Sequence, residues 1–158
     1  MRIRHTLFSI CAALAVFAVD VDGALAGNSA SSANSDIKVD DAWVRETPLG
    51  GSSGGGYVRI MNTGKEADRL IGAQSSAAQS IVLKQTTYVG EALQTRELPG
   101  GIEIAPGQSV LMRWEAYHLL FVGLKEPFKR DGEIEALLNF EKAGPITILF
   151  KVRPRVHW

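Results

Sequence analysis

Residues 115–128 read EAYHLLFVGLKEPF, and this stretch decides how the rest of the chain is interpreted. The apolar run at 118–124 is typical of a β-strand, and the Gly, Lys and Pro residues that follow it predict a turn. His118 is the only polar side chain within that run. The sequence therefore predicts a strand that carries a single imidazole.

Similar short runs occupy most of the remaining chain, separated by Pro-Gly, Asp-Gly and Gly-Pro turn sequences. No window carries an apolar stripe at helical spacing over three turns. Many short strands with turns between them predict one all-β domain, a Greek-key sandwich or barrel. Residues 48–56, rich in Gly and Ser, are expected to form a flexible loop. The predicted strands are 37–45, 57–61, 69–73, 80–85, 93–98, 102–104, 109–114, 118–124, 133–140 and 146–152.

The first residues predict export. A short basic lead is followed by an apolar run at 6–19 and by the small-residue sequence ALA at 24–26. This order is typical of a cleaved signal peptide, and the run is shorter than the roughly 20 residues that a spanning helix needs. We therefore expect a signal peptide at 1–26, a flexible leader at 27–36, the domain at 37–153 and a tail at 154–158, with the mature protein periplasmic and not inserted in the membrane.

Cleavage would remove Cys11, the only cysteine, and leave His118 and His157 as the imidazoles of the mature chain. Disulfides and thiolate metal ligands are then excluded. Seventeen Lys and Arg residues balance seventeen Asp and Glu residues, so no basic field predicts a nucleic-acid partner. The sequence lacks a nucleophile elbow, a paired-carboxylate motif and a His-rich zinc motif, which argues against an enzyme.

Several segments, in order along the chain, together resemble one family. They are DAWVR at 41–45, NTG at 62–64, DRLIGA at 68–73, RE at 96–97 and the YHLL and GLKEP sequences at 117–120 and 123–127. The chain is similar to the PCu(A)C family of periplasmic copper chaperones. That resemblance implies a cupredoxin-like fold and an exposed Cu(I) site of His and Met side chains. It also implies copper supply to the dinuclear copper A centre of cytochrome oxidase, with oxidase-assembly proteins or another copper carrier as partners.

The resemblance also implies where the ligands stand. His118 occupies the place of one family ligand histidine, whereas Lys84 stands in the place of the other. Thr86, Thr95 and Leu120 stand in the methionine places. Because a lysine ammonium has no lone pair to donate near neutral pH, we expect a weakened or altered copper site in which His118 is the one inherited ligand.

Other interpretations remain open at this stage. His118 is either a metal ligand or a strand histidine kept for packing, and His157 could contribute a ligand from the tail. Met61 and Met112 are expected in the core. A second function hypothesis is a metal-free assembly module that works through the face around Lys84, Thr95 and Leu120, and a third, a small-molecule binder, rests on fold analogy alone. Whether a fully liganded paralogue exists is also open.

Two sets of side chains are expected to have structural roles only. The larger aromatic residues are expected to form the core and its rims. Lys84, Arg59 and Arg113 are expected to be solvated charges on strand faces. The aromatic set is Trp43, Tyr57, Trp114, Phe121, Phe140 and Phe150.

Overall fold

The computed structural model describes residues 36–154, and the predicted signal peptide, almost all of the predicted leader and residues 155–158 lie outside this part. Within it every regular element is a strand, which confirms the all-β prediction, and no helix able to cross a bilayer occurs there. The strands are β1 (Ile37–Arg45), β2 (Ser53–Asn62), β3 (Asp68–Gln74), β4 (Ala78–Val89), β5 (Ala92–Glu97), β6 (Ile102–Ile104), β7 (Ser109–Leu111), β8 (Tyr117–Leu124), β9 (Glu133–Phe140) and β10 (Gly144–Arg153).

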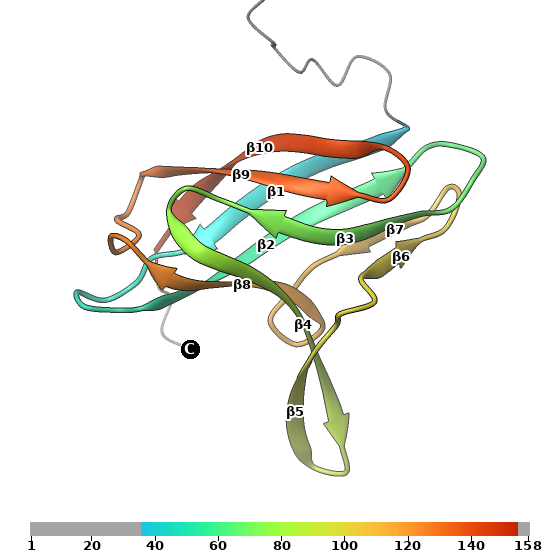
Figure 1. Cartoon of the computed structure of the whole chain (residues 1–158). Coiled ribbons are helices and arrows are strands. Elements are labelled where there is room, and N and C mark those ends of the chain that lie inside the picture. Colours follow the sequence, from blue (N-terminus) through green and yellow to red (C-terminus); the bar gives the residue numbers. More distant parts are fainter. Residues whose placement is uncertain (1–35, 155–158) are drawn as a thin grey trace, which may run out of the picture.

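The strands form a closed barrel (Figure 1). Hydrogen bonds connect them in the order β5-β4-β8-β2-β1-β10-β9-β3-β6, and an additional pairing of β3 with β4, Ala73 opposite Ile81, closes the circuit. Pairing is antiparallel except between β1 and β10, which run parallel. The non-consecutive neighbours are those of the predicted Greek-key barrel.

Three phenylalanine rings lie at the centre of the core. Phe121 on β8 is fully buried and makes edge-on contacts with Phe128, at a centroid distance of 5.4 Å, and with Phe150, at 5.8 Å. Edge-on pairs of this kind add to the stabilisation that burial itself provides. The apolar run at 118–124 therefore supplies the inward face of β8 and carries His118 on its outward face.

The prediction of a flexible loop through residue 56 is wrong at its second half. Strand β2 begins at Ser53, and Gly54 and Gly56 pair with Phe121 and Leu119 of β8. A Cβ atom on Gly56 would lie 2.6 Å from the Phe121 ring, and one on Gly54 would lie 2.8 Å from the Phe128 ring. These glycines are strand residues that leave space for aromatic rings. Because Gly and Ser are also typical of loops, the sequence of this segment resembles that of a loop.

Strand β4 is longer than the sequence predicted. It continues past Gln85 to Val89 and turns back into β5 through Gly90 and Glu91, with Val89 paired to Ala92. Gly90 has a φ of +65°, the left-handed value that a two-residue hairpin turn with Gly at its first position requires. The resulting hairpin projects away from the barrel (Figure 1), and every residue of β5 is exposed.

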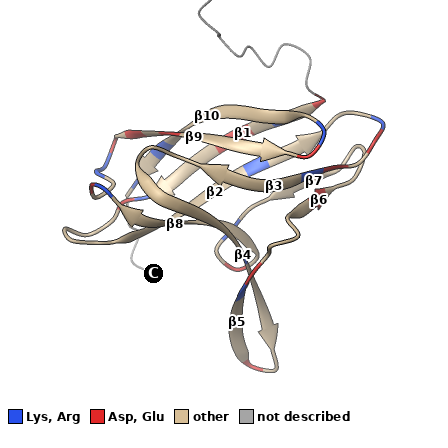
Figure 2. Ribbon diagram, viewed as in Figure 1, with Lys and Arg blue, Asp and Glu red and all other residues tan. Residues whose placement is uncertain are grey.

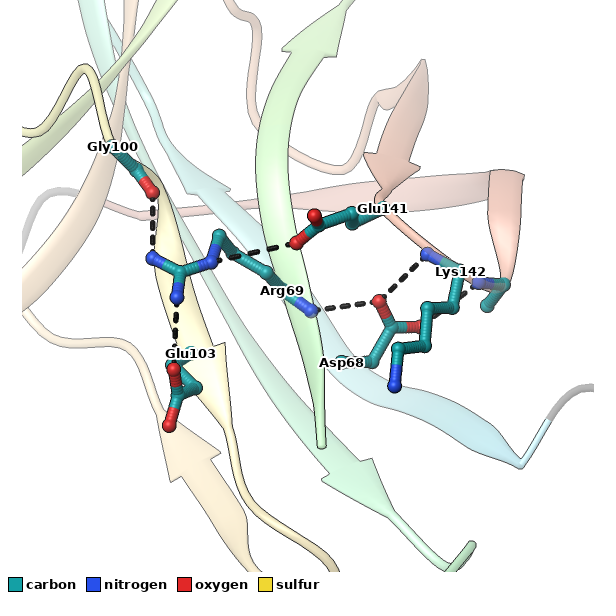
Figure 3. Close-up of polar contacts among 7 residues, drawn as sticks. Asp68, Arg69, Gly100, Glu103, Glu141 and Lys142 are labelled. Atoms are coloured by element: carbon teal, nitrogen blue, oxygen red, sulfur yellow. Dashed lines mark hydrogen bonds and ion pairs between the residues drawn. The ribbon is translucent and has the colours of Figure 1, made fainter. Parts of the chain in front are cut away.

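A polar network fixes the end of the barrel at which β3 begins (Figure 3). The Asp68 carboxylate accepts hydrogen bonds from the backbone N–H groups of Arg69, Lys142 and Ala143 at 2.7–2.9 Å. The Arg69 guanidinium donates to the Gly100 carbonyl and forms an ion pair with Glu103. Elsewhere charges of both signs are interspersed along the ribbon (Figure 2).

Replacing Asp68 by Ala is expected to destabilise the barrel by about 2–4 kcal/mol, because the Asp68 side chain is only 7% exposed and its loss leaves backbone donors without an acceptor. The free energy of unfolding from chemical denaturation measures the effect. Glu126→Ala, at an exposed position of the bend after β8, is the control and should change stability by less than about 0.5 kcal/mol. Equal losses in the two variants would show that the network does not stabilise this end.

Candidate metal-binding face

The residues that the resemblance assigns to ligand places lie on one surface. In an antiparallel sheet, directly opposed residues and alternate residues of one strand point to the same face. Lys84 is opposite His118 on β8 and Glu97 on β5, and Thr86 is opposite Thr95. Leu120 follows two residues after His118 and is opposite Val82. We call the surface formed by Lys84, Thr86, Thr95, His118 and Leu120 the ligand-place face.

Lys84 is not the solvated charge that the sequence predicted. Its side chain is only 18% exposed, and its Nζ donates a 2.9 Å hydrogen bond to Oε1 of Glu97, whose side chain is 65% exposed. The aliphatic stem thus lies along the strand surface while the ammonium reaches the carboxylate at its border. The residue that the resemblance assigns to the first histidine place is therefore one half of an ion pair.

The two threonines that the resemblance assigns to methionine places, Thr86 and Thr95, form a hydrogen bond with each other. Thr86 Oγ1 and Thr95 Oγ1 lie 2.9 Å apart in a hydrogen bond that joins β4 to β5. Thr86 is 5% exposed, and its backbone N–H donates to the carbonyl of Ala116 at 2.7 Å. A hydroxyl is a harder donor than a thioether, so this pair suits strand pairing better than it suits a soft metal ion.

His118 differs from its neighbours on this face because it retains an unused polar atom. The residue is partly exposed, and its Nδ1 is buried without a hydrogen-bond partner in the described part of the chain. Burial lowers the pKa of His118, and the charge of Lys84 acts in the same direction, while the backbone of Ala116 partly opposes both. The net effect favours the neutral form of the ring, which is the form that ligates metals.

The pKa of His118 is expected below its ordinary value of 6.5, and Lys84→Gln is expected to raise it by removing the neighbouring positive charge. Because the folded state then binds fewer protons than the unfolded state, stability should fall as pH drops through about 6.5. An NMR titration of the His118 ring checks the pKa values. Lys151→Gln, on an exposed residue of a different strand, is the matched control. A His118 pKa above 6.5, or one unmoved by Lys84→Gln, would contradict this interpretation.

The described residues do not make a complete soft-metal site on this face. Among residues 36–154, no group of three His, Cys, Asp or Glu side chains is arranged to hold a metal ion. Met112 is 1% exposed in the core, as predicted, and Met61 pairs with Lys38 of β1 and Ser109 of β7. Neither stands at a ligand place. His118 therefore offers one donor and needs others from elsewhere, and His157 lies outside the described residues.

Residues 37–152 match the model of the family described as LpqE-like, putative lipoprotein. A putative lipoprotein of Leifsonia xyli subsp. xyli is 28% identical over 117 residues, which cover 74% of this chain and 69% of that protein.

Solved structures of PCuAC domains share the fold. A copper-bound PCuAC domain from PmoF2 superposes with a TM-score of 0.64 at 25% identity, covering 76% of this chain and 94% of the other. The apo PCuAC domain from PmoF1 gives 0.66 at 22% identity, over 76% and 95% of the two chains. Cu(I)-bound DR1885 from Deinococcus radiodurans gives 0.59 at 20% identity, over 78% and 80%. The cupredoxin-like barrel predicted from the resemblance is confirmed. The chain therefore belongs to the LpqE-like family, and its barrel is of the PCuAC type.

Proposed function

We propose that this protein is an exported, non-enzymatic copper-handling protein that carries Cu(I) as cargo in the periplasm. Its recipient in this proposal is the assembly pathway of the copper A centre of cytochrome oxidase, through an assembly protein or a second copper carrier. The support is the PCuAC-type barrel together with the copper-bound form of the PmoF2 domain.

One observation carries the proposal to this chain: His118, which the resemblance assigns to a ligand place, has a lowered pKa and a buried Nδ1 without a hydrogen-bond partner among residues 36–154. An imidazole held in this way is ready to donate a lone pair. Because Lys84 and the two threonines offer no soft donor, the protein alone should bind Cu(I) weakly. A partner's thioether or imidazole, or His157, would complete the coordination during transfer.

A competition titration with a weak Cu(I) chelator, under anaerobic reducing conditions, tests the proposal on the chain that begins at Gly27. We expect stoichiometric but weak binding that His118→Ala abolishes. Lys84→Gln should retain or strengthen binding, since it leaves His118 in place and removes a positive charge. Binding that is unaffected by His118→Ala would contradict the assignment.

A second candidate is a metal-free assembly module on the same barrel. It is favoured by two contacts among residues assigned to ligand places or next to them: the Lys84–Glu97 ion pair and the Thr86–Thr95 hydrogen bond. These contacts stabilise the face without a metal. Absence of any competition with the weak chelator, in the presence and absence of an oxidase-assembly partner, would favour this module over the copper carrier.

The export and delivery parts of the proposal need a test in cells. In a strain that lacks the gene and grows at limiting copper, we expect reduced cytochrome oxidase activity that the wild-type gene restores. The His118→Ala gene should not restore it, and a gene without residues 1–26 should fail because its product stays in the cytoplasm. Full oxidase activity in the deletion strain would contradict delivery to the oxidase.

A further inference from the structure

A cavity of about 640 Å³ lies between the second half of β1, strand β2, the end of β7 and the segment that follows β7. Cavities of this size are typical of small-molecule sites. It reaches to Glu115, three residues before His118 in the sequence. Its lining, which we call the aromatic pocket, is Asp41, Trp43, Arg45, Tyr57, Leu111, Met112, Arg113, Trp114 and Glu115.

The tryptophan and tyrosine rings that line the pocket differ in their contacts and in their exposure. The rings of Trp43 and Tyr57 lie 4.4 Å apart between centroids, and the Arg153 guanidinium lies 5.1 Å from the Trp43 ring. Tyr57 is 6% exposed, whereas Trp114 is 45% exposed. Trp43 thus already contacts both Tyr57 and Arg153. Trp114, by contrast, has exposed indole surface on which an incoming ring could stack.

Only some of the charged side chains that line the pocket form ion pairs. Asp41 is paired with Arg153, whereas Arg45 and Arg113 have no ion-pair partner among residues 36–154. Glu115 is also unpaired in that range and carries the opposing charge on the rim. Two free guanidinium groups against one free carboxylate leave the pocket with an excess of positive charge. Guanidinium groups match the planar, two-oxygen geometry of a carboxylate.

We propose that the aromatic pocket binds a small aromatic carboxylate, with its ring against Trp114 and its carboxylate at Arg45 and Arg113. This proposal is independent of copper handling, because it uses none of the side chains of the ligand-place face. The ring would cover the apolar floor formed by Tyr57 and Met112. The negative charge of Glu115 would weaken binding of the anion, so removing that charge should raise the affinity.

The test uses 3-phenylpropionate as the probe, with the intrinsic fluorescence of the tryptophans as readout. A saturable change is expected, with 2-phenylethylamine, which carries the opposite charge on the same ring, binding at least tenfold more weakly. Arg45→Gln and Arg113→Gln should each weaken 3-phenylpropionate binding about tenfold, the equivalent of one charge-assisted hydrogen bond. Glu115→Gln should strengthen it. Trp114→Ala should abolish it, and Tyr88→Ala, at the exposed hairpin tip, should leave it unchanged.

Three results would overturn the proposal. The first is no saturable signal, and the second is equal or tighter binding of 2-phenylethylamine. The third is unchanged affinity in the Arg45→Gln/Arg113→Gln double variant, which tests the pocket even if Trp114→Ala fails to fold. The peptide acetyl-Gly-Gly-Phe ends in the same chemical unit and separates the two sources of this ligand. If it binds at least tenfold more tightly than 3-phenylpropionate, the occupant is a peptide C-terminus and the small-ligand proposal is wrong.

Discussion

Replacing Lys84 by His, and Thr86, Thr95 and Leu120 by Met, is expected to convert this chain into a tight Cu(I) binder. The register places all four positions on the same face as His118, so the new imidazole and thioethers would join an existing donor. Soft sulfur and imidazole ligands suit Cu(I). If each added donor contributes about 1.4 kcal/mol, affinity rises about tenfold per donor, or about ten-thousandfold in all. Competition titration against Cu(I) chelators of increasing strength measures the gain.

The matched control moves the same residue types to a place without His118. Thr147→Met, Leu149→Met and Lys151→His lie at alternate, exposed positions of β10. They reproduce the spacing of soft donors along one strand face but not the neighbouring histidine. The control adds three donors and the first design adds four, so an equal gain per added donor would mean that any exposed cluster of soft donors suffices. It would remove the special role assigned to the ligand-place face.

Phe121→Ala is expected to cost about 3–5 kcal/mol of stability, the largest effect of any single change considered for this barrel. The ring is 0% exposed and contacts both Phe128 and Phe150, so truncation leaves a cavity that the closed barrel cannot collapse to fill. Chemical denaturation measures the loss in free energy of unfolding. Val122→Ala, on the neighbouring but 36% exposed side chain, should cost far less. Similar losses for the two variants would contradict the assignment of Phe121 to the core.

The Phe121 ring also accounts for the presence of glycine at position 56, and a double-mutant cycle can test this. Gly56→Ala places a methyl group 2.6 Å from Phe121 and should destabilise the protein by about 1–3 kcal/mol through overpacking. In a Phe121→Leu background the cost of Gly56→Ala should shrink, because the smaller side chain vacates that space. Additive effects of the two substitutions would show that the ring does not impose the glycine.

The all-β class could be predicted because its signals are local. Alternating apolar residues and turn sequences placed the β1, β6 and β9 strands correctly at both ends. The beginning of β2 could not be predicted in that way. Its glycines look like a loop in the sequence, and only the long-range pairing with β8 and the rings of Phe121 and Phe128 makes them strand residues.

The contacts on the ligand-place face could not be predicted from the resemblance. It assigned His118, Lys84 and the threonines to ligand places, and the strand registers bring them to one face, but it gave no partner for Lys84. That partner follows from the turn at Gly90 and Glu91: if Val89 pairs with Ala92, counting outward pairs Thr86 with Thr95 and Lys84 with Glu97. Gly90 followed by an acidic residue between two β-prone runs was the signal that could have revealed the hairpin. The pairing of β4 with β8, by contrast, joins segments with no local link, and the sequence alone does not fix its register.

The aromatic pocket shows a further limit of sequence reasoning. Trp43, Tyr57 and Trp114 were interpreted as core and rim because nothing nearby in the sequence of each suggested a site. The cavity exists because β1, β2 and the segment after β7 meet in space, and this brings Arg45 and Arg113 to its border. Spatial proximity of that kind leaves no pattern in a single sequence.

The decisive measurement is an NMR titration of the chain from Gly27 with Cu(I) under reducing conditions, following the His118 ring and the methionine methyl groups together. If the soft-donor cluster has been reduced to one imidazole, His118 signals should shift while the methyl signals of Met61 and Met112 stay in place. A downfield shift of either methionine methyl group, or no change at His118 when Cu(I) is in excess, would contradict that conclusion.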